Sequence, residues 1–291
     1  MASQNLLLSV YMPVFNAAPY LPQSIESILS QSHKNFELVI VDDHSIDHSW
    51  SIIQSYAQRD HRIRAYRNPL NFGVSLTSNI AISKTRSKFL ARMDADDIST
   101  PDRLEKHLHY LQAHPKVIIV GGQCTIINDQ NQIVGFKHFP TDYYYLRDML
   151  FWAIPVQQGY MMINRSLLPD NFTWYSPSKT SAEETDLYFH LLCYGSLANL
   201  PDNLYFYRHL PDSLSHRSPK TTFWLTFQSR LNALRQGFIP SPKAIILNLL
   251  ELILITLLPS RFVYQLWYLF RGVTKYNLTN VPALEAQNQQ G

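Results

Sequence analysis

The chain is poor in cysteine and in charge of one sign. Its 291 residues include two cysteines, Cys124 and Cys193, which lie far apart and show no metal-ligand spacing. This excludes a disulfide-stapled scaffold and predicts a reducing compartment. The formal net charge of +3 is too small for a nucleic-acid-binding surface, so we expect no nucleic acid partner.

Long apolar runs and glycine-rich loops are also missing. The run 244–258 is interrupted by Asn248 and Glu251 and is shorter than the roughly 20 residues that span a bilayer. Residues 6–8 are too few and lack a basic flank, so we expect no signal peptide and a cytoplasmic N-terminal region. The loop 13–18 has no glycine and cannot be a glycine-rich phosphate loop.

Short apolar runs alternate with amphipathic stretches up to Gly122. This alternation predicts an α/β fold with a mostly parallel sheet and helices on both faces. We expect strands at 6–12, 36–41, 63–66, 89–93 and 117–120, and helices at 22–31, 49–58, 74–83 and 102–114. Residues 123–215 are less regular. We expect this region, including the segment 157–159, to select the acceptor, the second substrate of the predicted site.

Acidic residues end two of the predicted strands. Asp42 and Asp43 follow one strand, and Asp94, Asp96 and Asp97 follow another. Ligands of parallel sheets lie beyond the carboxyl ends of the strands, so both groups are predicted to share one site. Crowded carboxylates favour a bound Mg²⁺ or Mn²⁺. The alternative is a turn capped by aspartates, and Asp97 is assigned to that capping role.

A third acidic group precedes an apolar helix predicted at 187–194. Glu183, Glu184 and Asp186 stand there in four positions. A carboxylate at such a place can serve as a general base. The alternative is that the three acids only complement the helix dipole.

The C-terminal region, 218–291, has seven Lys or Arg and two Glu and is predicted to be helical. Its apolar segments 244–258 and 262–270 are flanked by Arg261, Arg271 and Lys275. Aromatic and basic flanks favour peripheral membrane contact through 244–275. The alternative is a pair of amphipathic helices packed on the catalytic domain or on another subunit.

The order of the motifs resembles family 2 inverting glycosyltransferases, which have the Rossmann-like GT-A fold and build bacterial cell-surface glycans. The resemblance covers about residues 6–216 and implies a catalytic domain, 1–217, with a nucleotide-sugar-binding half, 1–122, and an acceptor-binding half, 123–217. The matching segments are 10–16, 39–47, 71–73 with Asn79, 91–97 with 101–104, 182–187 and 207–208.

The resemblance implies a role for each matched residue. Asp43 would accept a hydrogen bond from the nucleotide base, Asp94 would contact the ribose, and Asp96 would bind a metal that bridges the diphosphate. Asp94 and His209 would be further metal ligands, although His209 directly follows Arg208, where the family more often has a residue between. The nucleotide-sugar-binding set is Pro13, Phe15, Asn16, Asp42, Asp43, Gly73, Asn79, Asp94, Ala95 and Arg208.

The implied reaction moves one sugar from a nucleotide-diphosphate donor, UDP being favoured, to a hydroxyl of a glycan or lipid-linked glycan. Glu184 stands at the position of the family's general base, one methylene longer than the usual aspartate, and Asp186 is a rival. The implied location is the cytoplasmic face of the inner membrane. Two alternatives are a sugar-1-phosphate nucleotidyltransferase, which the glycine-free loop 13–18 disfavours, and a catalytically silent nucleotide-sugar-binding scaffold.

Overall fold

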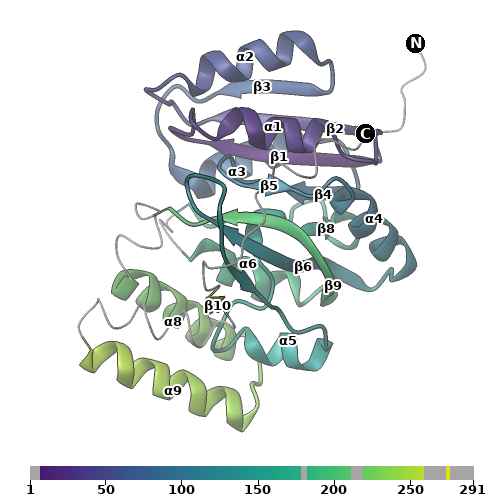
Figure 1. The fold of residues 1–291 in the computed structure, drawn as a ribbon. Helices are drawn as coiled ribbons and strands as arrows, with labels where there is room; N and C mark the ends of the chain where they lie inside the picture. The colour runs from purple at the N-terminus through teal and green to yellow at the C-terminus, as the bar shows by residue number, and fades with distance from the viewer. Residues whose placement is uncertain (1–6, 178–181, 211–218, 259–272, 276–291) are drawn as a thin grey trace.

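A mixed sheet runs through the molecule (Figure 1). The computed structural model describes residues 7–177, 182–210, 219–258 and 273–275. Within them the strands lie in the order β10-β7-β6-β8-β4-β1-β2-β3, and β9 pairs with both β5 and β6. The sheet therefore places early and late parts of the sequence side by side.

The first half of the sheet is parallel, as predicted. Its elements are β1 (Leu8–Val14), α1 (Leu21–Leu29), β2 (Phe36–Asp42), α2 (Ser49–Arg59), β3 (Ile63–Arg67), α3 (Gly73–Lys84) and β4 (Phe89–Arg92). The strands β4, β1, β2 and β3 are neighbours in that order, and each pair among them is parallel. The predicted strands and helices agree with these bounds to within about two residues.

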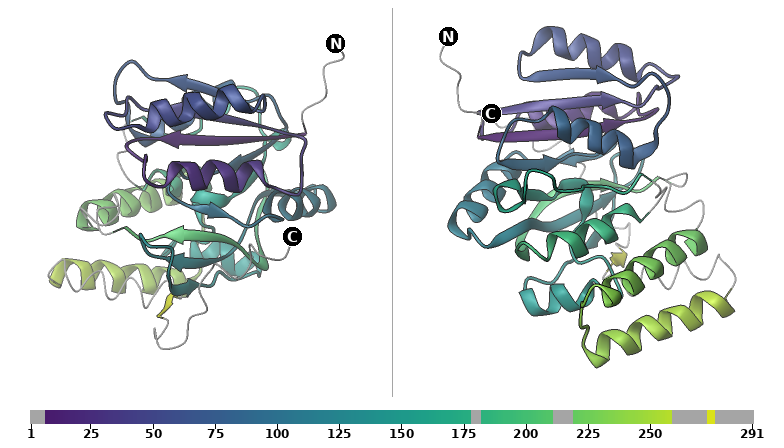
Figure 2. Two further views of the ribbon diagram at one scale, coloured as in Figure 1. Left: turned by 45° about the horizontal axis from the view of Figure 1, so that its top comes forward. Right: turned by 180° about the vertical axis from the view of Figure 1, so that it is seen from behind.

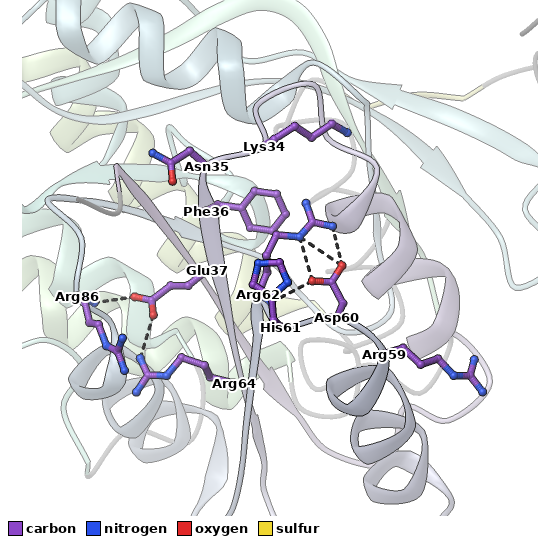
Figure 3. Close-up of a pocket in the computed structure, with 10 residues that line it drawn as sticks. All are labelled: Lys34, Asn35, Phe36, Glu37, Arg59, Asp60, His61, Arg62, Arg64 and Arg86. Carbon is purple, nitrogen blue, oxygen red and sulfur yellow. Dashed lines mark hydrogen bonds and ion pairs between the residues drawn. The ribbon is translucent and has the colours of Figure 1, made fainter. Parts of the chain in front are cut away.

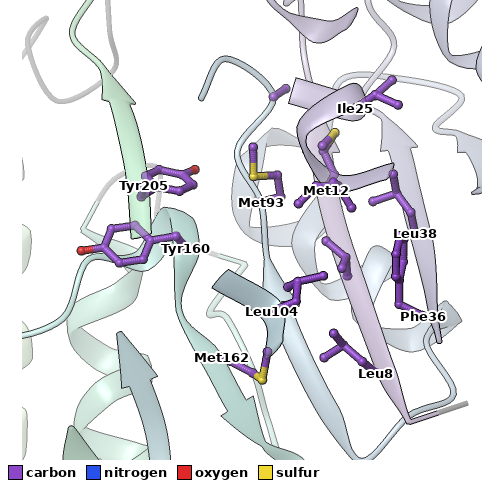
Figure 4. Close-up of a cluster of buried hydrophobic side chains, with 14 of the residues drawn as sticks. Leu8, Met12, Ile25, Phe36, Leu38, Met93, Leu104, Tyr160, Met162 and Tyr205 are labelled. Atoms are coloured by element: carbon purple, nitrogen blue, oxygen red, sulfur yellow. The ribbon is translucent and has the colours of Figure 1, made fainter. Parts of the chain in front are cut away.

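Alternate strand residues feed two cores on opposite faces of the sheet. Met12 and Leu38 pack with Ile25 of α1 on one face (Figure 4). Val39 packs with Ala81 of α3 on the other. Successive side chains of a strand point to opposite faces, so near-continuous apolar strands require cover on both. Helices on both faces are confirmed.

The second half adds antiparallel strands. It contains β5 (Ile98–Ser99), α4 (Arg103–Ala113), β6 (Val117–Ile127), β7 (Ile133–Lys137), β8 (Met162–Asn164) and β9 (Ser196–Arg208). β8 is antiparallel to β4 and β6, whereas β9 runs parallel to β6. The prediction ended β6 too early, because small and polar residues from Gly121 to Thr125 hide a strand that is buried along its whole length.

Helices complete the acceptor-side half and the C-terminal region. They are α5 (Tyr143–Met149), η1 (Gln158–Tyr160), η2 (Arg165–Leu167), α6 (Glu183–Leu191), α8 (Pro219–Arg235) and α9 (Pro242–Leu257), and β10 (Val273–Lys275) follows. Figures 1 and 2 show α8 and α9 side by side, at the end of the molecule opposite β3. In the described part of the chain, no helix combines the length and hydrophobicity needed to cross a bilayer.

The C-terminal helices are fastened to the sheet domain. α8 packs beside α6, and the Phe238 ring lies 6.1 Å from that of Phe151 and 5.0 Å from that of Phe189. Arg230 of α8 forms an ion pair of 2.7 Å with Glu251 of α9. Packing on the rest of the chain is thus observed for α9, which covers the first segment of the predicted pair, and membrane contact stays a prediction. The predicted interfacial segment 262–270, with Arg261 and Arg271, lies outside the described residues.

Candidate active site

Both acidic pairs lie at one edge of the sheet. The first pair is Asp42 with Asp43 and the second is Asp94 with Asp96. Asp42 is the register partner of Val14, and Arg92, just before the second pair, is the register partner of Tyr11 on the other side of β1. Across the sheet, β2 and β4 are therefore separated by two strand spacings, about 10 Å, and β4 ends three residues earlier than β2 when both are measured along β1. A nucleotide diphosphate is long enough to reach from one pair to the other.

The carboxylates of the first pair are bonded to other groups of the protein. Asp42 is fully buried and forms an ion pair of 3.0 Å with Arg67. Asp43 accepts hydrogen bonds of 2.8 Å from the Asn68 amide and from the backbone N–H of Gly73. Gly73 has a φ of +80°, which a side chain rarely tolerates. Both aspartates thus hold loops at the rim.

The loop after β1 presents an aromatic side chain. Phe15 is 50% exposed beside the end of β1, and the preceding Pro13 is partly exposed. Asn16 has a φ of +49°, and its side-chain oxygen accepts a hydrogen bond of 3.0 Å from the backbone N–H of Ile46. Asn16 therefore shapes the rim through a loop contact, whereas Phe15 is free to stack on a flat ligand.

Asn79 has a role that the sequence did not indicate. Its amide donates to the Tyr175 carbonyl at 2.8 Å and accepts from the Tyr175 backbone N–H at 3.0 Å. Both ends of the amide are therefore occupied by protein. Asn79 fastens Tyr175 to α3, and its predicted contact with the nucleotide sugar stays a prediction.

Asp94 is held by a buried cation. The Arg92 Nε lies 2.8 Å from Asp94 Oδ1, and Arg92 also donates to the Tyr175 hydroxyl at 3.1 Å. A Cβ on Gly159 would come within 2.6 Å of Asp94 Oδ2, so a side chain at this position would push the Asp94 carboxylate aside. Gly159 was assigned to the acceptor side of the site, but it lies directly against the predicted donor-binding carboxylate.

Asp96 differs from its neighbours in having no partner on another residue. Among the described residues, the Asp96 carboxylate, which is partly exposed, accepts a hydrogen bond only from its own backbone N–H. Burial raises the pKa of Asp96 to about 6, and the charge of Asp94 adds to the rise. The adjacent Ala95 holds the loop through its carbonyl, which accepts from the Ser24 hydroxyl at 2.8 Å.

The capping role predicted for Asp97 is wrong. Asp97 is buried and accepts a hydrogen bond of 2.6 Å from the backbone N–H of Arg208 on β9, whereas the N-cap of α4 is Asp102. Pairing of β5 with β9 brings these residues together. Burial and the charge of Asp96 raise the pKa of Asp97 well above its usual range.

Arg208 supports the Asp96 backbone. Its guanidinium donates to the Asp96 carbonyl at 2.7 Å, to the Asn128 carbonyl at 2.8 Å and to Gln23 at 3.2 Å. It also lies over the Tyr20 ring, 4.6 Å from the centroid. Direct contact between Arg208 and a donor stays a prediction. Ser213 and Ser215, which the resemblance groups with Arg208, and His216, the predicted substitute for His209 as a ligand, lie outside the described residues.

The second pair fits a hard divalent cation. Mg²⁺ is commonly held by one or two carboxylates together with substrate phosphates, and Asp94 and Asp96 supply the protein share. In the part of the chain that the structure describes, no three His, Cys, Asp or Glu side chains gather as metal ligands. His209 therefore does not complete a three-residue set, and its role as a ligand stays a prediction.

The acids of α6 differ in exposure. Glu183 is buried, whereas Glu184 and Asp186 are partly exposed. Burial raises the pKa of Glu183 to about 7, and the charge of Glu184 adds to the rise. Glu183 also interacts electrostatically with Arg92 and Asp94, which places the first turn of α6 beside the acidic rim. Ala182, just before the helix, has a φ of +56°.

Sequence reasoning gave no role to Arg92 or Tyr175, placed Gly159 on the acceptor side only, and preferred Glu184 to Glu183. Arg92 lies inside the quoted motif, and Glu183 directly precedes the predicted base. An arginine in an otherwise apolar buried strand was the available signal, because such a charge needs a partner. Tyr175 gave no signal, since its contacts with Arg92 and Tyr11 exist only in the folded chain.

A cavity of about 500 Å³ lies at the other end of the strands (Figure 3). It is lined near the starts of β2 and β3, where Glu37 pairs with Arg64 at 2.9 Å and Asp60 with Arg62 at 2.7 Å. Its carboxylates are therefore neutralised. Since it lies at the amino ends of the strands, it is separate from the acidic rim.

Known proteins resemble this chain in sequence. An uncharacterized glycosyltransferase of Haemophilus influenzae is 28% identical over 210 residues, which cover 69% of this chain and 65% of that protein. A putative teichuronic acid biosynthesis glycosyltransferase, TuaG of Bacillus subtilis, is 31% identical over 140 residues, covering 48% and 56%. The matched region thus spans less than two thirds of the length of these relatives.

Solved structures share the fold. TarS of S. aureus, residues 1–349 in complex with UDP-GlcNAc, has a TM-score of 0.65 at 16% identity and covers 83% of this chain and 70% of its own. The mannosyltransferase PcManGT of Pyrobaculum calidifontis, in complex with GDP-Man and Mn²⁺, has a TM-score of 0.58 at 16% identity, covering 91% and 85%. The GT-A fold is confirmed by these similarities.

The family model described as glycosyl transferase family 2 matches residues 9–172, which is more than half of the chain. The matched range contains the rim of β1, β2 and β4 and ends before α6. The chain belongs to glycosyl transferase family 2.

Proposed function

We propose that this glycosyltransferase moves a single sugar, with inversion, from a nucleotide-diphosphate donor to a hydroxyl of a glycan or lipid-linked glycan. The observation that carries the proposal is the partly exposed Asp96 carboxylate at the same rim as Phe15, to which no other residue of the described part of the chain donates a hydrogen bond. Phe15 and Pro13 offer a surface on which the nucleotide base stacks. A UDP-sugar is the favoured donor, and TarS, which shares the fold, was solved with UDP-GlcNAc.

Asp96 and Asp94 would hold Mn²⁺ or Mg²⁺. A divalent ion stabilises the negative charge that grows on the departing diphosphate. Arg208 and Ser24 hold the backbone carbonyls of Asp96 and Ala95, which keeps the Asp96 backbone at the rim. PcManGT, which shares the fold, was solved with Mn²⁺.

Glu184 is proposed as the general base. The attacking hydroxyl must lose its proton to a carboxylate on the face of the sugar opposite the diphosphate. Direct attack assisted by one base inverts the anomeric centre. Glu184 is partly exposed on the first turn of α6, as is its rival Asp186, whereas the buried Glu183 cannot reach a substrate hydroxyl.

We further propose that α9 rests on the cytoplasmic face of the inner membrane, where lipid-linked acceptors are anchored. The polar residues of α9 face the protein, whereas its apolar residues face outward. Asn248 is buried against the protein, and Glu251 pairs with Arg230. Its exposed face carries Ile245, Ile246, Leu249, Leu250, Ile253 and Leu257. An aliphatic face in a basic region suits anionic lipid, which would cover that face and attract the positive charge.

The reaction is tested with purified full-length protein, Mn²⁺ and a panel of UDP-, dTDP- and GDP-sugars. We expect slow hydrolysis of one donor, and thermal stabilisation by the matching nucleotide diphosphate. Binding without hydrolysis or transfer to any acceptor would favour the silent scaffold. Formation of a nucleotide sugar from a nucleoside triphosphate and a sugar-1-phosphate would favour the nucleotidyltransferase.

The membrane proposal is tested by flotation with anionic and zwitterionic vesicles. The triple variant Ile246→Ser, Leu250→Ser, Ile253→Ser should float less than the parent, and the parent should prefer anionic vesicles. The control is Ile46→Ser with Leu70→Ser, which removes two exposed aliphatic side chains outside α9. Equal flotation of all three proteins would contradict the proposal, as would a dimer that the triple variant dissociates.

A further inference from the structure

We propose that Arg92 is a positioning residue that ties the carboxylate Asp94 to the acid-bearing helix α6 through Tyr175. The inference rests on the proposed function, since it concerns how donor and acceptor sides of that site are held together. Nothing in the reaction requires Arg92 to touch a substrate. Its role follows from its place between the two sides.

Arg92 is fixed from several directions. It is 3% exposed, and its backbone N–H donates to the Met161 carbonyl at 3.0 Å, while its own carbonyl accepts from Arg103 at 3.0 Å. Its Nε meets Asp94 and its Nη1 meets the Tyr175 hydroxyl, so one planar guanidinium serves two partners. The fork of an arginine can do this, whereas the single ammonium of a lysine cannot hold both geometries.

Tyr175 is also anchored at both its ends. Its backbone is held by the two hydrogen bonds of Asn79, and its hydroxyl lies 3.0 Å from that of Tyr11 on β1. The Tyr175 side chain is buried. Tyr175 shares a buried core cluster with Leu187 and Tyr188 of α6, so its hydrogen bonds join that cluster to α3 through its backbone and to β1 and β4 through its side chain.

The positive charge of Arg92 also compensates two nearby carboxylates. Glu183 at the start of α6 interacts electrostatically with Arg92, as does Asp94. Without this cation, two acids at the donor and acceptor sides would face each other with no compensating charge. Removing one member of a buried charged set is strongly destabilising for the partners that remain.

The consequence concerns the geometry of attack. Asp94 belongs to the donor side, and Glu184 follows Glu183 on the acceptor side, so Arg92 and Tyr175 set the separation between bound donor and base. A misplacement of about 1 Å can lower a rate about 100-fold. Loss of the link should therefore lower kcat and leave affinity for the nucleotide almost unchanged.

The test compares Tyr175→Phe with the control Tyr160→Phe. Both remove a buried hydroxyl, and that of Tyr160 donates to the Gly122 carbonyl at 2.6 Å, outside the link. We expect kcat to fall about 10-fold in Tyr175→Phe and less than 2-fold in Tyr160→Phe, with the Kd for UDP and Mn²⁺ within 2-fold of the parent in both. Arg92→Lys should resemble Tyr175→Phe, and the double variant should be no worse, because both changes break one link.

A second readout does not need turnover. Hydrogen exchange at residues 183–191 should quicken in Tyr175→Phe and stay unchanged in Tyr160→Phe. Equal exchange and equal kcat in the two variants would overturn the proposal, as would a loss of UDP affinity that parallels the loss of rate. Failure of the reaction itself appears separately, as a parent enzyme that neither hydrolyses nor transfers.

Discussion

The two acidic pairs at the rim have similar sequences but opposite surroundings. Asp42 and Asp43 are buried and bonded to Arg67, Asn68 and Gly73. Asp94 has one buried cation, and Asp96 is partly exposed beside it with a raised pKa. The first pair is stabilised by its neighbours, whereas the second concentrates negative charge that the protein alone does not neutralise.

This contrast separates structure from function at one edge of one sheet. A carboxylate that accepts backbone hydrogen bonds stabilises the fold, and a carboxylate left short of donors is available to a cation. The difference arises from what packs around each strand end. It therefore gives distinct expectations for substitutions in each pair.

The largest effect is expected for Asp96→Asn. Transfer should fall at least about 100-fold, because the substituted side chain no longer holds the ion that stabilises the leaving diphosphate. Stability should rise at pH 7–8. The folded pKa of about 6 exceeds the ordinary 3.8, so the ionised carboxylate costs stability increasingly as pH rises from about 4 to 6.

Activity assays and urea unfolding at pH 5 and pH 8 check this prediction. The stabilisation of Asp96→Asn over the parent should be on the order of 1–2 kcal/mol at pH 8 and smaller at pH 5. Full activity of Asp96→Asn, with the Mn²⁺ dependence of the parent, would contradict the view that the second pair holds the ion and the first pair does not.

Glu184→Gln should come next in size. Loss of the base should lower kcat about 100-fold or more while the Kd for UDP stays the same, because donor binding does not use this carboxylate. Asp186→Asn is the matched comparison on the same turn and should lower kcat far less. A larger loss of kcat in Asp186→Asn than in Glu184→Gln would make Asp186 the base.

Asp42→Asn should act on stability. It breaks the buried ion pair with Arg67 and should lower the free energy of unfolding by about 1–3 kcal/mol, with kcat of the folded protein unchanged. Urea unfolding and UDP titration measure the two quantities. A large loss of UDP affinity with normal stability would show instead that Asp42 contacts the nucleotide.

The smallest effect is expected for Ala182→Gly, next to the third acidic group. Ala182 is left-handed, which costs a non-glycine residue about 1–2 kcal/mol, and glycine recovers part of this against its greater unfolded entropy. We expect a stability gain below about 1 kcal/mol by urea unfolding. A clear loss of stability would mean that this conformation is not adopted in solution.

The parallel half of the fold was predictable from sequence, and the other half was not. Apolar strands and amphipathic helices up to Gly122 repeat with periods that local geometry dictates. The long strand β9 does not show an alternation of apolar and polar residues, because Pro201 and Asp202 interrupt it. Its position in the sheet is set by pairing with β6. Pairing over that separation leaves no local trace.

The site was predictable to the level of residue type. The acidic motifs were found in order, and the topology brings two of them to one edge. The partners of Asp97, Asn79 and Arg208 were not predicted, since each lies on a distant segment. The link from Arg92 to Tyr175 spans 83 positions and is invisible to any local pattern.

By itself the sequence determined the alternation of strands and helices and the carboxylates that follow β2 and β4, because periodicity and strand ends are local properties. Only the tertiary structure decided which carboxylates are bonded within the protein and which remain available to a cation. The hydrogen-bond donors and basic groups that bond them belong to other segments of the chain. The tertiary structure also turned the polar residues of α9 inward. Burial, which depends on all neighbours at once, separates a structural acid from a functional one.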